Sequence, residues 1–173
     1  MTEAPRPGSA CVIRRMTADD CEAVWQIEKA TFPQPWSLRD FEHEMRENVC
    51  ARYLVAEMEG RIVGFAGAHI ILDEGHITNI AVSAAFRGQG IGRKLLQSLL
   101  QYASNLGAQY LTLEVRADNE PAKRLYQSLH FIRVGIRKKY YEDQQDAWIM
   151  VTERMSDADP DFEEAETVTS KGP

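Results

Sequence analysis

Three glycines fall within the six residues RGQGIG, at residues 87–92 of the sequence. The strand-like segment NIAV precedes them, and a leucine-rich segment with helical spacing follows. A strand that enters a helix through a glycine-rich turn presents unpaired backbone N–H groups and the positive end of the helix dipole. The pattern therefore predicts a site for an anionic group, and phosphate fits this description best.

Two nucleotide-binding fingerprints can be compared with this loop. A P-loop requires Gly-Lys-Ser/Thr, whereas Gly92 is followed by Arg93 and Lys94. A dinucleotide-binding G-x-G-x-x-G that starts at Gly88 requires glycine at position 93, which is arginine. Both fingerprints fail. Taken alone, the loop is equally well explained as a tight strand-to-helix turn that binds nothing.

The segments around the loop show the periodicities of a mixed α/β domain. Apolar residues recur at helical spacing from Ile91 to Leu106, and this predicted helix ends at Gly107. It connects predicted strands at 75–82 and 110–116, which should therefore be parallel neighbours. Further helices are predicted at 17–30, 37–47 and 119–129, and further strands at 11–17, 52–58, 61–71, 131–141 and 146–152.

The composition bounds the class of protein. With 173 residues, 44% of them hydrophobic, the chain fits one globular domain, which we expect at residues 11–155. We expect residues 1–10 and the acidic segment 156–173 to be disordered. That segment carries a charge of −5 out of the net −6, so the rest is nearly neutral and lacks the basic excess of a nucleic-acid-binding protein.

The termini and the cysteines indicate the cytoplasm. The N-terminus has neither the basic start nor the apolar stretch of a signal peptide, and no apolar run is long enough to span a membrane. We therefore expect a cytoplasmic protein with no membrane partner. Cys11, Cys21 and Cys50 are widely spaced and form no CxxC pair, so neither a disulfide framework nor a metal site is indicated.

Several short motifs occur in order along residues 11–153: NIAV, RGQGIG, LEVRADN, AKRLYQSLHF and DAWIM. With these motifs the sequence resembles the GNAT N-acetyltransferase superfamily. The segment FPQPWS at residues 32–37, the strand DEGHITNIAV and the tyrosine pair at 140 and 141 are similar to the RimI-like branch, the ribosomal-protein-alanine N-acetyltransferases. The resemblance implies a GNAT fold, an α/β architecture with a mixed central sheet of about seven strands and flanking helices.

The resemblance also implies acetyl-CoA as cosubstrate and no metal. The main chain of Ile80, Ala81 and Val82 is expected to pair with the pantetheine arm, although a plain buried strand explains these residues equally. Asn119 is expected to contact acetyl-CoA, and it also suits the N-cap of the next helix, with Pro121 in the first turn. The pyrophosphate is expected at the amides of Arg87, Gly88, Gln89, Gly90, Ile91, Gly92 and Arg93.

Acetyl transfer to an amine needs a group that accepts the amine proton and a group that returns a proton to the leaving thiolate. Glu114 alternates with Leu113 and Val115 along its predicted strand, so its side chain points away from the packed face. The resemblance assigns Glu114 as the proton acceptor and Tyr126 as the proton donor. The alternatives are a solvated strand face for Glu114 and ordinary core packing for Tyr126.

The substrate amine can be bounded by its pKa. Removing the proton at neutral pH costs a lysine roughly 3.5 kcal/mol more than an α-amino group, which favours a protein N-terminus. The resemblance specifies the N-terminal alanine of a small-subunit ribosomal protein, and it places Trp36, Tyr140 and Tyr141 beside the peptide groove, where plain packing is the alternative. A lysine or small-amine acetyltransferase and a non-catalytic acetyl-CoA-binding adaptor stay open as alternative functions.

We expect a monomer or weak dimer, and structural roles for His69 and His76.

Two positions depart from the family pattern. The helix before residue 131 usually ends in LGF, but here His130 replaces the glycine, so we expect it to adopt a left-handed conformation or to end the helix differently. Gln145 replaces the first acid of the usual EDA motif near the substrate end. The acidic C-terminal segment is an addition to the pattern; a solvated end is its simplest role and a basic ribosomal partner the alternative.

Overall fold

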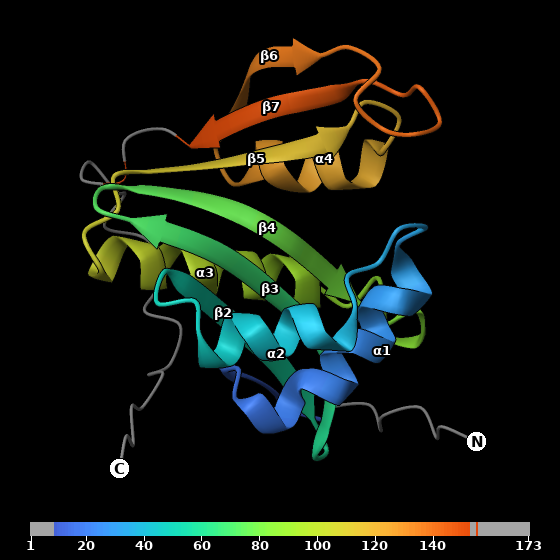
Figure 1. Ribbon diagram of the computed structural model, residues 1–173, viewed down its shortest axis with the longest axis vertical. Coiled ribbons are helices and arrows are strands. Elements are labelled where there is room, and N and C mark those ends of the chain that lie inside the picture. Colours follow the sequence, from blue (N-terminus) through green and yellow to red (C-terminus); the bar gives the residue numbers. More distant parts are fainter. Residues whose placement is uncertain (1–8, 153–154, 156–173) are drawn as a thin grey trace.

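The computed structural model describes residues 9–152 and residue 155, which form one mixed sheet with helices on both faces (Figure 1). Within this part of the chain the sheet has seven strands in the order β1-β2-β3-β4-β5-β7-β6. The strands are β1 (Cys11–Arg15), β2 (Ala51–Met58), β3 (Arg61–Ile71), β4 (Glu74–Val82), β5 (Tyr110–Arg116), β6 (Phe131–Arg137) and β7 (Ala147–Thr152). The helices are α1 (Cys21–Thr31), α2 (Leu38–Arg46), α3 (Ile91–Asn105) and α4 (Glu120–Ser128). The predicted α/β architecture is confirmed.

The strand order follows from short antiparallel connections and one crossover. Strands β1 to β4 form an antiparallel meander, and α3 then carries the chain across to β5. β5 lies parallel to β4, as predicted for two strands joined by a crossover helix. β7 pairs antiparallel with β5, and β6 forms the outer edge of the sheet.

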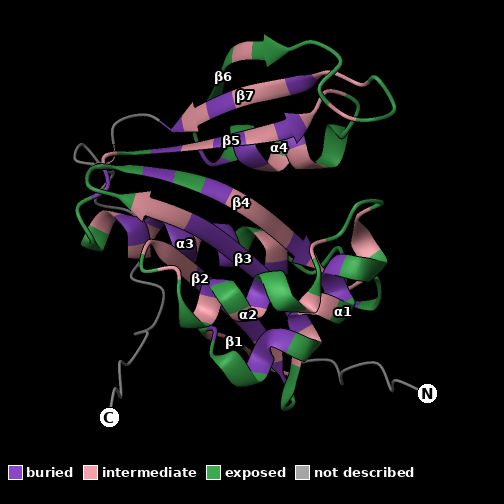
Figure 2. Ribbon diagram, viewed as in Figure 1, coloured by how far each residue is buried: buried purple, intermediate pink, exposed green. Residues whose placement is uncertain are grey.

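Two apolar clusters hold the layers together, one on each face of the sheet. The larger cluster packs α3 and α4 against the strands and includes Leu95, Leu111 and Phe131. The smaller cluster lies under α1 and α2, where the ring centroids of Phe41 and Phe65 are 5.7 Å apart. Figure 2 shows the buried residues concentrated in β2 and β3 and the exposed residues in β6. The burial of these apolar side chains is the dominant favourable contribution to folding.

Local signals in the sequence set the helix ends. The Ser37 hydroxyl accepts from Asp40 N at 3.2 Å and the Asp40 carboxylate accepts from Ser37 N, so α2 begins with a capping box. Asn119 caps α4 through its side-chain oxygen, which accepts from Ala122 N. Gly107 follows α3 with a φ of +93°, the left-handed geometry predicted for this helix end.

The parallel strands β4 and β5 are paired over a short stretch. The pairing joins Glu74–His76 to residues 110–112, and the two ribbons diverge beyond it (Figure 1). The β3–β4 register shifts between Gly67 and Ala68, which leaves Thr78 as an extra residue of β4. A β-bulge bends its strand and increases the local twist. The bulge therefore turns β4 away from β5 directly after their last paired residues.

One strand is shorter than predicted. The sequence pattern favours a strand over 131–141, but β6 ends at Arg137. Lys139 has a φ of +49°, which is incompatible with continued strand pairing, and its N–H donates to the Asp146 carboxylate at 2.9 Å. Tyr140 and Tyr141 therefore lie in the connection from β6 to β7, residues 138–146, and not on a strand.

Some expectations concern the ends of the chain and the type of site. Residues 1–8 and 156–173, which cover most of the segments expected to be disordered, lie outside the described residues. Within residues 9–152 no helix is long and apolar enough to cross a membrane. In the same part of the chain, no cluster of three His, Cys, Asp or Glu side chains is arranged to hold a metal ion.

His130 adopts the left-handed conformation, with a φ of +67°, directly after the C-cap residue of α4. A Cβ atom costs free energy in this conformation, so His130→Gly should raise the free energy of unfolding by about 1 kcal/mol. Denaturant unfolding followed by circular dichroism measures the change. His130→Ala keeps the Cβ atom and is the control; an equal gain from alanine would contradict this explanation.

Candidate active site

Beyond its first three residues, β4 has one hydrogen-bonded edge and one free edge. Ile80, Ala81 and Val82 pair with β3, where Ala81 lies opposite Phe65. On the other edge, the pairing with β5 has already ended at His76. Backbone N–H and C=O groups on this edge need a partner from a ligand or from water. The edge therefore suits an extended ligand chain that pairs with the main chain, as the family resemblance implies.

The glycine loop begins where β4 ends and turns into α3. Gly88 and Gly90 both have a φ of +79°, and nothing described lies within 4 Å of the position that a Cβ atom would take on either. The first hydrogen bond of α3 runs from Lys94 N to Gly90 O at 3.0 Å, so the amides of residues 91–93 precede it. An open main chain at a helix N-terminus fits the predicted anion site.

Two arginines bring positive charge to this loop. Arg87 Nε donates to Val82 O at 3.0 Å, which ties the loop to the end of β4. Arg93 donates to Ser128 Oγ at 2.8 Å, which ties α3 to α4. Neither guanidinium forms an ion pair with a described acidic residue. Both charges are therefore available to a bound anion.

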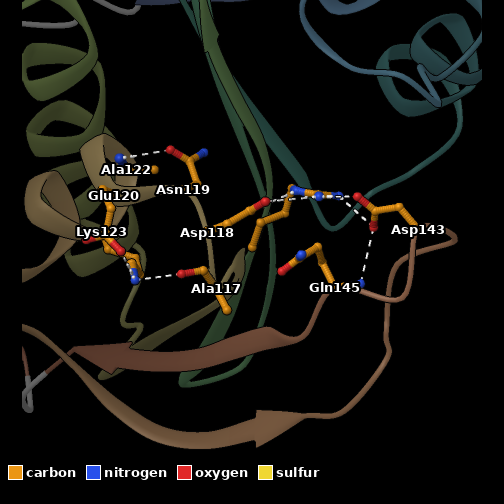
Figure 3. Close-up of polar contacts among 9 residues, drawn as sticks. Ala117, Asp118, Asn119, Glu120, Ala122, Lys123, Asp143 and Gln145 are labelled. Carbon is orange, nitrogen blue, oxygen red and sulfur yellow. Dashed lines mark hydrogen bonds and ion pairs between the residues drawn. The ribbon is translucent and has the colours of Figure 1, made fainter.

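Asn119 lies at the start of α4, just after β5. Figure 3 shows its side-chain oxygen directed at Ala122 N, 3.2 Å away, which is the N-cap bond. Lys123 lies in the same turn, where Nζ donates to Ala117 O at 2.6 Å and pairs with Glu120. The predicted N-cap role of Asn119 is confirmed, and its contact with acetyl-CoA stays a prediction.

Glu114 lies on β5, two residues beyond the last β4–β5 pair, with its side chain on the face opposite α4. The side chain is 19% exposed, and Oε1 accepts from Arg137 Nε at 2.9 Å. Tyr140 forms a hydrogen bond with the same carboxylate, which is the main reason why the pKa of Tyr140 lies above its ordinary value. A partly exposed carboxylate in this position can accept a proton from an amine.

Tyr126 belongs to α4 and is buried on the other face of the sheet, with its ring centroid 5.8 Å from that of Phe131. Burial, and to a smaller extent the charge of Tyr141, raises the pKa of Tyr126 well above the usual range. The hydroxyl is therefore protonated at neutral pH, and no described residue forms a hydrogen bond with it. The neighbouring Leu125 lies 3.7 Å from the Cβ position of Gly92, so this part of α4 adjoins the glycine loop.

Tyr141 interacts electrostatically with both Glu114 and Tyr126. Burial and the negative charge of Glu114 raise the pKa of Tyr141. Tyr141 in turn contributes to the raised pKa of Tyr126. Arg116, two residues after Glu114 on β5, lies over the Tyr141 ring at 4.9 Å and pairs with Asp143. Arg116 therefore fixes the β6–β7 connection against β5.

The β6–β7 connection is also held by its own main chain. Gln145 N donates to the Asp143 carboxylate at 3.3 Å (Figure 3), and Tyr141 N donates to Gln145 O at 3.2 Å. Both bonds of Gln145 use main-chain atoms that any residue supplies. The geometry of the connection therefore does not depend on an acidic side chain at position 145.

Trp36 lies in the connection from α1 to α2, which Figure 1 places at the same end of the sheet as the β6–β7 connection. The main-chain N–H of Trp36 donates to Glu28 Oε1 at 3.3 Å. The side-chain amide of Asn79, on β4, donates to the other carboxylate oxygen of Glu28, Oε2, at 3.4 Å. Glu28 is only 3% exposed, and burial raises its pKa. The buried carboxylate thus anchors the α1–α2 connection to β4.

Both strand histidines have side-chain partners. His69 Nε2 lies 2.6 Å from Glu44 Oε2, which binds β3 to α2. His76 Nδ1 lies 3.0 Å from Thr112 Oγ1 at the last paired position of β4 and β5. Burial lowers the pKa of His76, so the ring is neutral at pH 7. These contacts support the structural roles predicted for both residues.

The structure brings three of the predicted catalytic and substrate-binding residues together and leaves Trp36 apart. Glu114 interacts with Tyr140 and Tyr141, and the two tyrosine rings contact each other, whereas Trp36 lies beyond β4 and contacts Phe41 and Glu28 instead. The sequence reasoning missed Arg116 and Arg137, which hold the connection and the carboxylate. For Arg116 the available signal was its position two residues after Glu114 on β5, which places both on the same strand face, whereas the partner of Arg137 is distant in sequence.

Comparison with known proteins agrees with this geometry. The Acetyltransferase (GNAT) family matches residues 21–131. The ribosomal protein bS18-alanine N-acetyltransferase of Salmonella typhimurium is 38% identical over 138 residues, which cover 78% of this chain and 92% of that protein. The crystal structure of the ribosomal-protein-S18-alanine N-acetyltransferase from Escherichia coli matches with a TM-score of 0.77 at 34% identity, over 83% of this chain and 93% of that chain.

A more distant structure shares the fold. Arabidopsis thaliana NAA60 in complex with acetyl-CoA matches with a TM-score of 0.74 at 21% identity, over 82% of this chain and 97% of that chain. The family match covers more than half of the chain and includes β4, the glycine loop, β5 and α4. The chain therefore belongs to the acetyltransferase (GNAT) family, as its motifs predict.

Proposed function

We propose that this protein transfers an acetyl group from acetyl-CoA to the α-amine of the N-terminal alanine of a small-subunit ribosomal protein of the bS18 type. The observation that carries the proposal is the position of Glu114, two residues past the point where β5 leaves the free edge of β4. The named activity of the relatives at 34–38% identity supports the choice of substrate. A ribosomal target places the reaction in the cytoplasm.

In this proposal acetyl-CoA lies along the free edge of β4. The main chain of Ile80, Ala81 and Val82 pairs with the pantetheine arm, and Asn119 makes a further contact. Trp36 and the β6–β7 tyrosines, Tyr140 and Tyr141, flank the peptide. The pyrophosphate meets the amides of Arg87, Gly88, Gln89, Gly90, Ile91, Gly92 and Arg93, at the N-terminus of α3.

The proposed chemistry is direct attack. The neutral α-amine attacks the thioester carbonyl, so that a C–N bond forms and the C–S bond breaks. Glu114 accepts the proton that the amine loses, and Tyr126 donates a proton to the leaving thiolate. The raised pKa of Tyr126 keeps its proton in place until this step. Glu114 then loses its proton to solvent and Tyr126 regains one, which restores the enzyme.

Peptides with an internal lysine test the substrate class. One peptide starts with a free alanine and a matched control starts with an acetylated alanine; both are incubated with acetyl-CoA and mapped by fragmentation in a mass spectrometer. Because the α-amine is the easier group to deprotonate, we expect one acetyl group on the free alanine and none on the blocked peptide. Acetyl on the lysine would indicate a lysine acetyltransferase instead, and no transfer at all would favour the adaptor.

Glu114→Gln removes the proton acceptor and keeps the size of the side chain. We expect kcat for the alanine peptide to fall about 100-fold or more, with the affinity for acetyl-CoA retained. Glu57→Gln is the matched control, because Glu57 also pairs with an arginine, Arg14, but lies at the far side of the sheet on β2. Unchanged turnover in Glu114→Gln would contradict the mechanism.

Tyr126→Phe removes the proton donor and keeps the ring in the core. We expect kcat to fall about 100-fold while the dissociation constant of acetyl-CoA, measured by calorimetry, stays close to wild type. Tyr102→Phe, on α3, is the control and should leave both values unchanged. An equal loss of acetyl-CoA binding in Tyr126→Phe would instead identify Tyr126 as a structural residue.

A further inference from the structure

Glu28 is a buried carboxylate that has N–H groups, and no cation, as its described partners. It lies in the last turn of α1, the helix that packs on β3 and β4 (Figure 1). Its side chain is 3% exposed, and no arginine, lysine or histidine of the described residues pairs with it. Burying an unpaired charge is costly, and a core that only needs to be packed is often more stable with an apolar side chain at such a position. Packing alone therefore does not explain a carboxylate here.

The two partners of Glu28 belong to different parts of the proposed site. Trp36, whose main-chain N–H donates to one carboxylate oxygen, lies in the α1–α2 connection, beside the proposed peptide. Asn79, whose amide donates to the other oxygen, lies directly before Ile80, where the main chain pairs with acetyl-CoA in the same proposal. Asn79 is also the first residue after the bulge of β4, and its Oδ1 accepts from Thr78 Oγ1 at 2.8 Å. One carboxylate thus links the peptide side of the site to the acetyl-CoA side.

The α1–α2 connection, residues 32–37, has few main-chain donors with which to hold its position. Pro33 and Pro35 have no N–H group. The N–H of Ser37 is used in the capping box of α2, so it fixes the connection to that helix and not to the sheet. The N–H of Trp36 differs, because the carboxylate that accepts it is also bonded to β4. Its bond therefore sets where the connection lies relative to the free edge of β4.

We propose that Glu28 is a positioning residue for the reaction, which holds the peptide-binding connection at the distance from β4 that brings the α-amine to the acetyl group. The inference rests on the proposed function, because that function places the peptide beside Trp36. Glu28 touches neither substrate and acts through Trp36. A connection that is fixed before the peptide arrives does not have to be ordered during binding, so less binding free energy is lost. The contribution of Glu28 therefore appears in KM for the peptide.

Glu28→Gln tests the proposal in the full chain. The glutamine has nearly the same size but only one acceptor oxygen, so it cannot accept from both N–H groups. With an alanine-starting peptide and acetyl-CoA, we expect KM for the peptide to rise about tenfold, because the connection loses its link to β4. We expect kcat and KM for acetyl-CoA to stay within about twofold of wild type, since neither the reacting groups nor the main chain of β4 is changed.

An exchange of the two side chains provides a rescue. In the double variant Glu28→Gln with Asn79→Asp, the glutamine amide donates to the new carboxylate, and the glutamine oxygen still accepts from Trp36 N. Both bonds are restored, with the charge moved to β4. We expect KM for the peptide to return to within about threefold of wild type. A peptide KM that stays as high as in Glu28→Gln would assign the effect to a general disturbance of the core and overturn the proposal.

Glu44→Gln is the matched control. Glu44 is a second buried glutamate on this side of the sheet, 8% exposed, but it lies in the last turn of α2 and bonds to His69 and Asn48. This variant should keep KM for the peptide within about twofold of wild type, and thermal unfolding should show that the variants are folded. An equal rise in KM in Glu44→Gln, or an unchanged KM in Glu28→Gln, would overturn the inference and leave the proposed function intact.

A second variant covers the case in which Glu28→Gln does not fold. Asn79→Ser removes one of the two bonds and keeps the carboxylate, so we expect KM for the peptide to rise about threefold or more. An unchanged KM in this variant would overturn the inference. A wild type that does not acetylate the alanine-starting peptide would remove the proposed function and the inference together, which distinguishes that failure from the others.

Discussion

The contact between Tyr53 and Gly67 determines the geometry on which the site depends. A Cβ atom on Gly67 would lie 2.1 Å from the Tyr53 ring, so glycine is needed for the ring to pack against β3. From this position the Tyr53 hydroxyl lies 2.9 Å from Oγ1 of Thr78, the residue that bulges from β4. The bulge follows the last pair of β4 and β5 directly. The Tyr53 side chain from β2 thus contacts the extra residue of β4 at the bulge, next to the point where the free edge of β4 begins.

The parts of the fold that could be predicted are those with local causes. Ser37, Asn119 and Gly107 set helix ends through bonds and dihedral angles within a few residues, and the crossover helix makes β4 and β5 parallel. The bulge at Thr78 could not be predicted, because it depends on a tyrosine 25 residues away in sequence. The early end of β6 depends in the same way on Asp146.

The Glu114 carboxylate and the β6–β7 connection form one mechanical unit. Arg137 and Tyr140 both bond to Glu114, and Arg116 stacks on Tyr141 and pairs with Asp143. A shift of the β6–β7 connection would therefore move the partners of Glu114 with it. The sequence predicted Glu114 and the two tyrosines as site residues, but their contacts with one another depend on the three-dimensional register of β5, β7 and β6.

The proposed acid and base lie on opposite faces of β5, and their burial differs in a way that suits their tasks. Glu114 is partly exposed, so a proton accepted from an amine can pass to solvent. Tyr126 is buried, and the resulting rise in its pKa keeps its hydroxyl protonated, as a proton donor must be. Groups on opposite faces can act on one reacting centre only at a strand edge that no neighbour covers. In the proposed mechanism the bulge that separates β4 from β5 therefore does more than admit an extended ligand, because it also lets Glu114 deprotonate the amine from one face while Tyr126 protonates the leaving sulfur from the other.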